Sequence, residues 1–163
     1  MTTTAAPTAS GRQPGLGILA ARLLFAVQDE LYQRLEAAGH GELTRFHGAV
    51  IAHLDETGTR ATELARRSGR HKQVIGRIVD ELEALGYVER RAEAADRRAK
   101  LVVPTNRGRK VMRLSDEIVH DIERRVARTI GEVRFESFWK ALTTVVDALT
   151  ERADPAPYAD HTS

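Results

Sequence analysis

The chain has 163 residues, of which 42% are hydrophobic and only 5% aromatic, which is enough for one ordinary domain with a modest core. It contains no cysteine, which excludes disulfide bonds and thiolate metal sites. No run of about 18 apolar residues is present, which excludes a membrane-spanning helix. The N-terminal residues lack the apolar stretch of a secretory signal, so we expect a cytoplasmic protein.

Charge is distributed unevenly along the chain, although the formal net charge is only +2. Between Arg60 and Arg113 there are 15 Lys or Arg against 7 Asp or Glu, whereas the rest of the chain has 10 basic and 16 acidic residues. A localised positive field attracts polyanions whatever the total charge. The central segment is therefore expected to contact an anionic polymer such as nucleic acid.

The chain begins with a polar tail and a helix. Residues 1–15 are rich in small and polar residues and are expected to form a flexible tail, as are residues 153–163 at the other end. Apolar residues at steps of three and four predict a helix over Leu16–Ala38. The glycines of the segment 39–41 end it, because glycine tolerates the left-handed backbone.

The middle of the chain predicts three more helices. Thr44 offers an N-cap for a second helix, whose apolar face comprises Phe46, Val50, Ile51 and Leu54. After a loop over residues 55–59, the pattern predicts a short helix over Ala61–Arg67, a turn over Ser68–Arg70 and a helix over His71–Leu85. The apolar stripe of this last helix comprises Val74, Ile75, Ile78, Val79, Leu82 and Leu85.

A small β-hairpin is expected next. Gly86 is placed to end the preceding helix, and two short strands follow over Tyr87–Arg90 and Ala99–Val103. Pro104 ends the second strand. The basic stretch between the strands therefore lies at the tip of a hairpin.

Two long helices complete the chain. We expect them over Asn106–Ile130, with Thr105 as the cap, and over Glu132–Arg152, separated by Gly131. Their wide apolar stripes, like that of the first helix, have no obvious layer within the chain to cover them. Pairing with a second copy is the simplest solution. We therefore expect residues 16–41 and 105–152 to form a homodimer.

The segment 61–85 has helix-turn-helix spacing. Ala65 is small where two helices must approach, Gly69 takes the tight turn, and Ile75 packs the second helix on the first. The second helix then projects hydrogen-bonding side chains and a close backbone toward the major groove of DNA: His71, Lys72, Gln73, Gly76 and Arg77. The first helix supplies Arg66 and Arg67 for contacts with the phosphate backbone.

A hairpin directly after a helix-turn-helix is a wing. Arg97 and Arg98 at its tip suit the narrow minor groove, where negative potential is concentrated. Asp96 is placed to brace the wing. Basic side chains flanking the tip are expected along the DNA backbone: Arg90, Arg91 and Lys100. The fold class is therefore mainly α with a small β-hairpin wing, a winged helix-turn-helix over residues 42–104 flanked by dimerisation helices.

Residues 43–108 resemble the multiple-antibiotic-resistance regulator (MarR) family of winged-helix transcription factors. The resemblance rests on four motifs: "ELA" at 63–65, "RIVDELEALGYVER" at 77–90, "DRRAKLV" at 96–102 and "TNRG" at 105–108. It implies a homodimer on a pseudo-palindromic operator, with Arg98 in the minor groove. It also implies repression of its own or a neighbouring gene, relieved by a small, often aromatic and anionic effector.

The histidines give weaker signals. His47 and His53 lie near the ligand crevice that the resemblance implies, and we take them as candidate effector-binding residues. Gly48 between them either opens a cavity or allows close packing on the first helix. Three or four converging ligands for a metal are not evident, so no metal site or other cofactor is expected. No catalytic motif is present either, so an enzyme is not expected.

Two alternatives to this repressor stay open from the sequence. One is a protein-interaction module that uses the winged-helix fold without DNA. The other is a metal-gated sensor that binds DNA and responds to zinc at the histidines.

Overall fold

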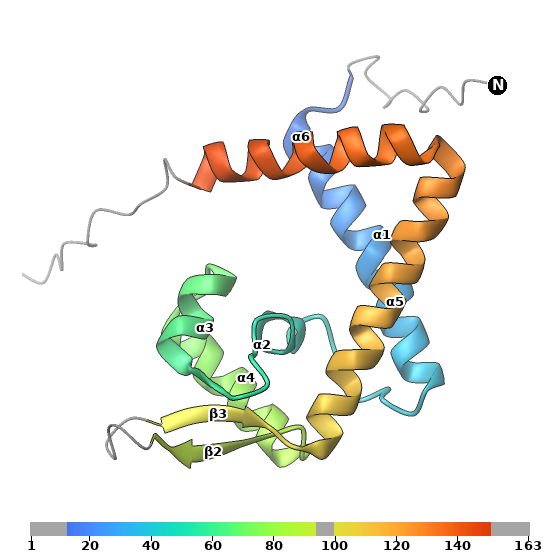
Figure 1. Ribbon diagram of the computed structural model, residues 1–163. Helices are drawn as coiled ribbons and strands as arrows, with labels where there is room; N and C mark the ends of the chain where they lie inside the picture. The colour runs from blue at the N-terminus through green and yellow to red at the C-terminus, as the bar shows by residue number, and fades with distance from the viewer. Residues whose placement is uncertain (1–12, 94–99, 151–163) are drawn as a thin grey trace, which may run out of the picture. The chain divides into compact units, whose positions relative to one another are not determined.

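The computed structural model describes residues 13–93 and 100–150 (Figure 1). Its elements are α1 (Leu16–Ala37), α2 (Gly48–Ile51), β1 (Thr59–Arg60), α3 (Ala61–Ser68), α4 (Lys72–Ala84), β2 (Val88–Ala92), β3 (Lys100–Pro104), α5 (Asn106–Ile130) and α6 (Glu132–Thr150). The predicted mainly helical fold with a small hairpin is confirmed. The chain divides into two compact units, and the boundary between them falls within α5, between Val119 and His120. Among the described helices, none has the length and apolarity needed to cross a membrane.

The helix-turn-helix of α3 and α4 forms as the spacing predicts. Gly69 has a positive φ of 64°, and the N–H of Arg70 donates to the carbonyl of Ala65 at 3.1 Å, which closes α3. The two helices bury Leu64, Ile75, Ile78, Val79 and Leu82. The prediction that Val74 belongs to this buried stripe is wrong, because its side chain is 36% exposed.

The second helix is much shorter than predicted. Thr44 does not begin it: the Thr44 N–H donates to Nδ1 of His47 at 3.0 Å, and α2 is a single turn from Gly48. Val50 is buried as expected. Phe46, predicted on the inner face, is 60% exposed, because it lies in the turn before the helix rather than on a helical face.

Gly48 allows α2 to approach α1 closely. A Cβ atom at Gly48 would lie 2.7 Å from the hydroxyl oxygen of Tyr32, which is on α1. Burial raises the pKa of the Tyr32 phenol. Of the two roles considered for Gly48, the structure therefore favours close packing on the first helix over an open cavity.

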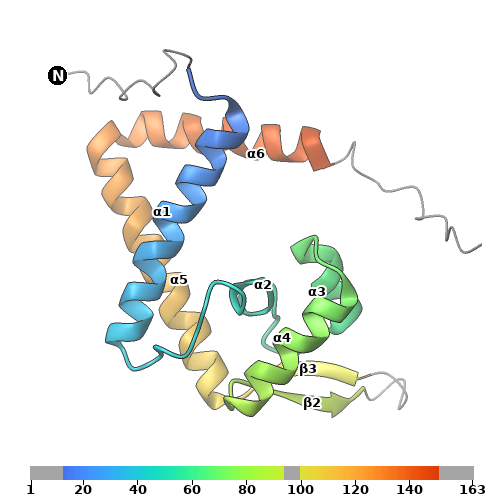
Figure 2. The same cartoon turned by 180° about the vertical axis from the view of Figure 1, so that it is seen from behind.

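The sheet has three antiparallel strands in the order β1-β3-β2. In β2 and β3, Val88 pairs with Pro104 and Ala92 with Lys100. Among the described residues, both strands begin one residue later than predicted and also end later. The hairpin lies alongside α4 (Figure 2). The edge strand β1, predicted as loop, pairs with β3 through two residues, which is too short for an alternating pattern to reveal.

The end of α4 and the start of α5 meet at one backbone junction. Gly86 ends α4 with a positive φ of 76°. The Thr105 hydroxyl donates to the Gly86 carbonyl at 2.7 Å and accepts the N–H of Gly108 at 3.1 Å, which caps α5 as predicted. A Cβ at Gly108 would lie 2.0 Å from the carbonyl oxygen of Tyr87. The Thr-x-x-Gly motif thus has a steric cause.

We predict opposite effects for two helical Gly→Ala substitutions. Gly108→Ala should destabilise the fold by at least about 2 kcal/mol, because the clash is with backbone that cannot rotate away. Gly76→Ala should stabilise it by up to about 1 kcal/mol, because nothing lies within 4 Å of the new Cβ. Urea unfolding of both variants measures this. Equal effects at the two positions would contradict the packing described.

Candidate nucleic-acid interface

The predicted recognition residues share one exposed region at the start of α4. His71 has extended backbone before the helix, and the side chains of Lys72, Gln73 and Arg77 are exposed. Neither the Lys72 nor the Gln73 side chain forms a hydrogen bond or ion pair with any other residue that the structure describes. No atom lies within 4 Å of a Cβ placed on Gly76. The structure therefore presents polar side chains and an uncrowded backbone on a single helix.

Arg77 is paired, but weakly held. Its Nε donates to Glu81 at 3.0 Å, yet its side chain is 83% exposed. This hydrogen bond is the main reason why the pKa of Glu81 is lowered. Exposed pairs of this kind contribute little free energy, so the guanidinium is available to a phosphate or a base.

Arg66 and Arg67, predicted together as phosphate contacts, have different surroundings. Arg66 is 74% exposed, and among the described residues it binds only Glu63, at 2.6 and 2.8 Å. Arg67 donates to Glu63 at 2.7 Å, to Asp55 at 3.0 Å and to the carbonyl of His53 at 3.1 Å. Arg67 therefore braces α3 against the segment before β1, and its contact with phosphate stays a prediction.

The two arginines hold the Glu63 carboxylate in its charged form. Their hydrogen bonds lower the pKa of Glu63 from 4.5 to about 2. At a pH between about 2 and 4.5, Glu63 therefore binds a proton in the unfolded chain but not in the folded chain. The resulting stability is fully present above pH 4.5 and is lost as the pH falls toward 2.

We predict that Glu63→Gln flattens the acid limb of the stability profile. Between pH 5 and about 2.5 the unfolding midpoint of the unsubstituted chain should fall more steeply than that of the variant. Asp55, Glu42 and Glu81 also have lowered pKa values and remain in the variant, so some slope should persist. Glu117→Gln, on an exposed position of α5, controls for the loss of a carboxyl group. Identical slopes in all three proteins would contradict the pairing.

The base of the wing is held from two sides. Arg60 on β1 donates to Glu93 at 2.8 Å. Arg90 on β2 donates its N–H to Glu83 at 3.0 Å, and its guanidinium contacts Asp80 at 2.5 Å and also Glu83. Arg90, expected along the DNA backbone, is instead bound to α4. Spacing alone could not show this, because it depends on how the hairpin lies against the helix.

The outer wing is described only in part. Lys100 is exposed at the start of β3, and Arg91 is exposed and pairs with Glu89. The residues predicted at the tip, Asp96, Arg97 and Arg98, lie outside the described residues. Their roles stay predictions.

The two candidate effector histidines differ in burial and in hydrogen-bond partners. His47 is buried; Nδ1 accepts the Thr44 N–H and Nε2 lies 3.3 Å from Glu81. His53 is half-buried, and its carbonyl accepts from Arg67. Neither observation tests an effector role. Over residues 13–93 and 100–150, no three potential metal ligands converge.

A polar cluster that the sequence analysis did not predict links three segments. His40 Nδ1 lies 2.7 Å from the Tyr87 hydroxyl, which donates to Glu42 at 2.6 Å. Arg107 lies over the Tyr87 ring at 4.3 Å and pairs with Glu42. The cluster joins the chain after α1 to the residue that precedes β2 and to α5. Because its members are distant in sequence, no local signal could have found it.

The MarR family model matches residues 42–99. The chain is also similar to solved structures. One is CouR from Rhodococcus jostii RHA1 bound to p-coumaroyl-CoA, with 24% identity, coverage of 86% of this chain and 93% of that chain, and a TM-score of 0.65. A second is the transcriptional repressor CouR bound to a 23-mer DNA duplex, with 24% identity, coverage of 81% and 92%, and a TM-score of 0.65.

A third is MepR, a transcription regulator of the Staphylococcus aureus multidrug efflux pump MepA, with 19% identity, coverage of 83% and 99%, and a TM-score of 0.61. At these identities the likenesses show a shared fold. No curated protein matches the sequence.

Proposed function

We propose, from the match of residues 42–99 to the MarR family model, that this chain is a cytoplasmic transcriptional repressor of that family. It binds a pseudo-palindromic operator in double-stranded DNA as a homodimer and leaves the operator when a small effector binds. The observation that carries the proposal is the exposed, hydrogen-bonding start of α4 within a helix-turn-helix that is followed by a wing.

The charge and shape of this surface suit duplex DNA. An α-helix fits the major groove, where Lys72, Gln73 and Arg77 can reach base edges or phosphates. Arg97 and Arg98, which lie outside the described residues, are proposed to contact the adjacent minor groove. In a homodimer, two such helices would read half-sites whose centres lie about 10 bp apart.

Exposed apolar side chains on the long helices support dimerisation. In α1 these include Leu16, Ile18, Leu24 and Phe25, each at least 50% exposed. In α6 they include Val133 at 78% and Leu149 at 58%. Many large apolar side chains exposed on the same helices indicate an interaction surface, and a second copy supplies matching helices.

Repression and effector release are supported by the relatives and by one pocket. CouR is a repressor seen with DNA and, separately, with p-coumaroyl-CoA. In this chain a pocket of about 260 Å³ lies against α4 and is lined by Thr44, Phe46, Val74, Arg77, Ile78 and Glu81. Arg77 belongs both to this pocket and to the recognition surface. A ligand in this pocket would draw Arg77 away from DNA. His47 contacts a residue that lines the pocket, because its Nε2 lies 3.3 Å from Glu81.

We predict tight, salt-sensitive binding to the intergenic DNA beside the gene. Lys72→Ala and Arg98→Ala should each weaken operator binding by about 10- to 100-fold without unfolding the protein. Where the lost contact is to phosphate, the slope of log affinity against log salt should also fall by about 0.9. Fluorescence anisotropy with competitor DNA measures both. Arg124→Ala, on α5 and outside the winged helix, removes the same charge and should bind normally.

Three results would exclude parts of the proposal. Unchanged affinity in Arg98→Ala removes the wing assignment. Weak binding that is equal for any DNA favours the protein-interaction module. If adding a chelator abolishes or increases operator binding, the metal-gated sensor is favoured.

We also predict that two acidic residues on α4 strengthen DNA binding. Removing a negative charge near DNA normally increases affinity, because repulsion of phosphate is lost. Asp80→Asn and Glu83→Gln should instead lower the affinity for DNA by about 3- to 10-fold. Each substitution weakens the contact that holds Arg90, and through Arg90 the wing, against α4. The exposed Glu56→Gln is the control and should bind equally or more tightly.

A double variant separates positioning from direct contact. If Arg90 acts only through Glu83, then Arg90→Gln combined with Glu83→Gln should bind no worse than Arg90→Gln alone. Thermal unfolding of each variant checks that the fold persists. Tighter binding by Glu83→Gln would contradict the bracing role of Glu83.

A further inference from the structure

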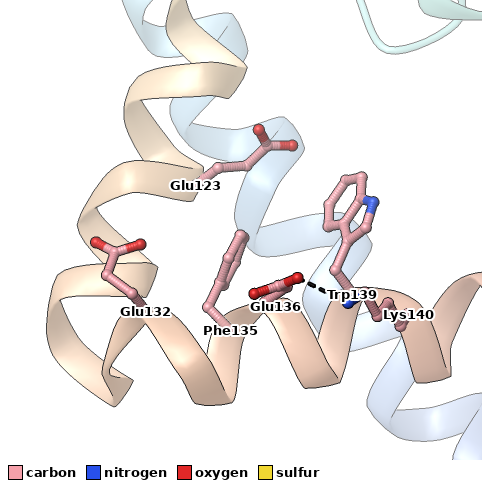
Figure 3. Close-up of a pocket in the computed structure, with 6 residues that line it drawn as sticks. All are labelled: Glu123, Glu132, Phe135, Glu136, Trp139 and Lys140. Atoms are coloured by element: carbon pink, nitrogen blue, oxygen red, sulfur yellow. Dashed lines mark hydrogen bonds and ion pairs between the residues drawn. The ribbon is translucent and has the colours of Figure 1, made fainter.

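Large apolar side chains are exposed in two places. Most lie on α1, α5 and α6, including Trp139, which with Phe135 lines a pocket of about 420 Å³ at the turn from α5 to α6 (Figure 3). A second copy of the chain is expected to cover these helices. Among the described residues, only Phe46 and Val74 are large, apolar and exposed outside the three long helices. Dimerisation through those helices therefore does not account for their exposure.

A hydrogen-bonded turn places Phe46 beside the start of α4. The N–H of His47 donates to the carbonyl of Thr44 at 2.9 Å, and the Thr44 N–H donates to Nδ1 of His47 at 3.0 Å. His47 is buried, whereas the preceding Phe46 stays 60% exposed. The Phe46 side chain borders the same pocket as Val74, which is on the first turn of α4.

The guanidinium of Arg70 lies over this exposed ring. The Cζ atom of Arg70 is 5.6 Å from the ring centroid of Phe46, which is within the range of a cation–π contact. Arg70 comes two residues before Lys72, the first residue of α4. A guanidinium stacks on an aromatic face because it is planar and weakly hydrated. The ring therefore holds the side chain in place without neutralising its charge.

Arg70 differs in its partners from the other arginines of the segment 60–93. Within the described residues, each of the others pairs with at least one carboxylate: Arg60, Arg66, Arg67, Arg77, Arg90 and Arg91. The Arg70 side chain forms no hydrogen bond or ion pair with any described residue. A paired arginine must share or leave its carboxylate before it binds a phosphate. Arg70 has no such competitor among the described residues.

We propose that Arg70, held on the Phe46 ring, contacts a DNA phosphate beside the start of α4. This inference rests on the proposed function and adds a contact that the sequence analysis did not assign. In a helix-turn-helix, the N-terminal residues of the second helix reach base edges in the major groove. A long basic side chain just before that helix is then within reach of the flanking strand. Contacts with phosphate fix the position of the helix on the duplex.

The salt dependence of binding tests the Arg70 contact. The full-length protein is titrated against its operator and against an unrelated duplex by fluorescence anisotropy at several salt concentrations. Arg70→Gln should weaken binding to both duplexes by about 3- to 10-fold near 0.1 M salt, and the slope of log affinity against log salt should fall by about 0.9. Arg124→Gln, on α5, removes the same charge and should leave affinity and slope unchanged.

Substitutions of Phe46 test whether its ring positions Arg70. Phe46→Leu should weaken binding by about 2- to 5-fold with the salt slope kept, because Arg70 must then be ordered during binding. Phe46→Tyr keeps a ring and should bind like the unsubstituted chain. When Arg70→Gln is already present, Phe46→Leu should have no further effect. Thermal unfolding and size-exclusion chromatography of each variant check the fold and the oligomeric state.

The outcomes separate this inference from the proposed function. If the unsubstituted chain binds no DNA, both are overturned. If it binds DNA and Arg70→Gln keeps the affinity and the salt slope, this inference alone is overturned. A greater loss on the operator than on unrelated DNA would place Arg70 on a base edge and overturn the phosphate contact. Equal losses in Phe46→Leu and Phe46→Tyr, or a changed oligomeric state in either, would overturn the positioning role of the ring.

Discussion

The winged helix depends on the close approach of the first turn of α5 to the backbone between α4 and β2. Thr105 binds the Gly86 carbonyl and caps α5, and Gly108 has no side chain to separate its helix from Tyr87. Through this junction the end of the recognition helix, the start of the wing and the start of α5 share one set of backbone contacts. A displacement of α5 therefore reaches both parts that are expected to touch DNA.

The basic residues of the central segment divide into two groups. Arg67, Arg90 and Arg107 bind carboxylates and carbonyls of the protein itself and hold α3, the wing and α5 in place. Among the described residues, Lys72 and Gln73 have no such partners, and Arg66 and Arg77 each pair with a single carboxylate. The count of positive charges in this segment therefore overstates the number of side chains that are available to DNA.

Local signals predicted the elements that depend on a few neighbouring residues. Gly69 and Gly86 end helices at the expected places, because only the left-handed backbone closes those turns. Patterns failed where a side-chain hydrogen bond or a surface pocket changes the surroundings of a residue. Phe46 lies in a turn because His47 takes the Thr44 N–H, and Val74 faces a surface pocket although its position fits the apolar stripe.

The sequence by itself determined the fold class, the helix-turn-helix and the location of the basic surface, because helical periodicity, glycine turns and charge are properties of nearby residues. Only the tertiary structure decided which arginines are internal braces, how β1 joins the sheet, and that His40, Glu42, Tyr87 and Arg107 form one cluster. These features join residues that are distant along the chain. Their pairing depends on the packing of helices against the hairpin, which no local pattern encodes.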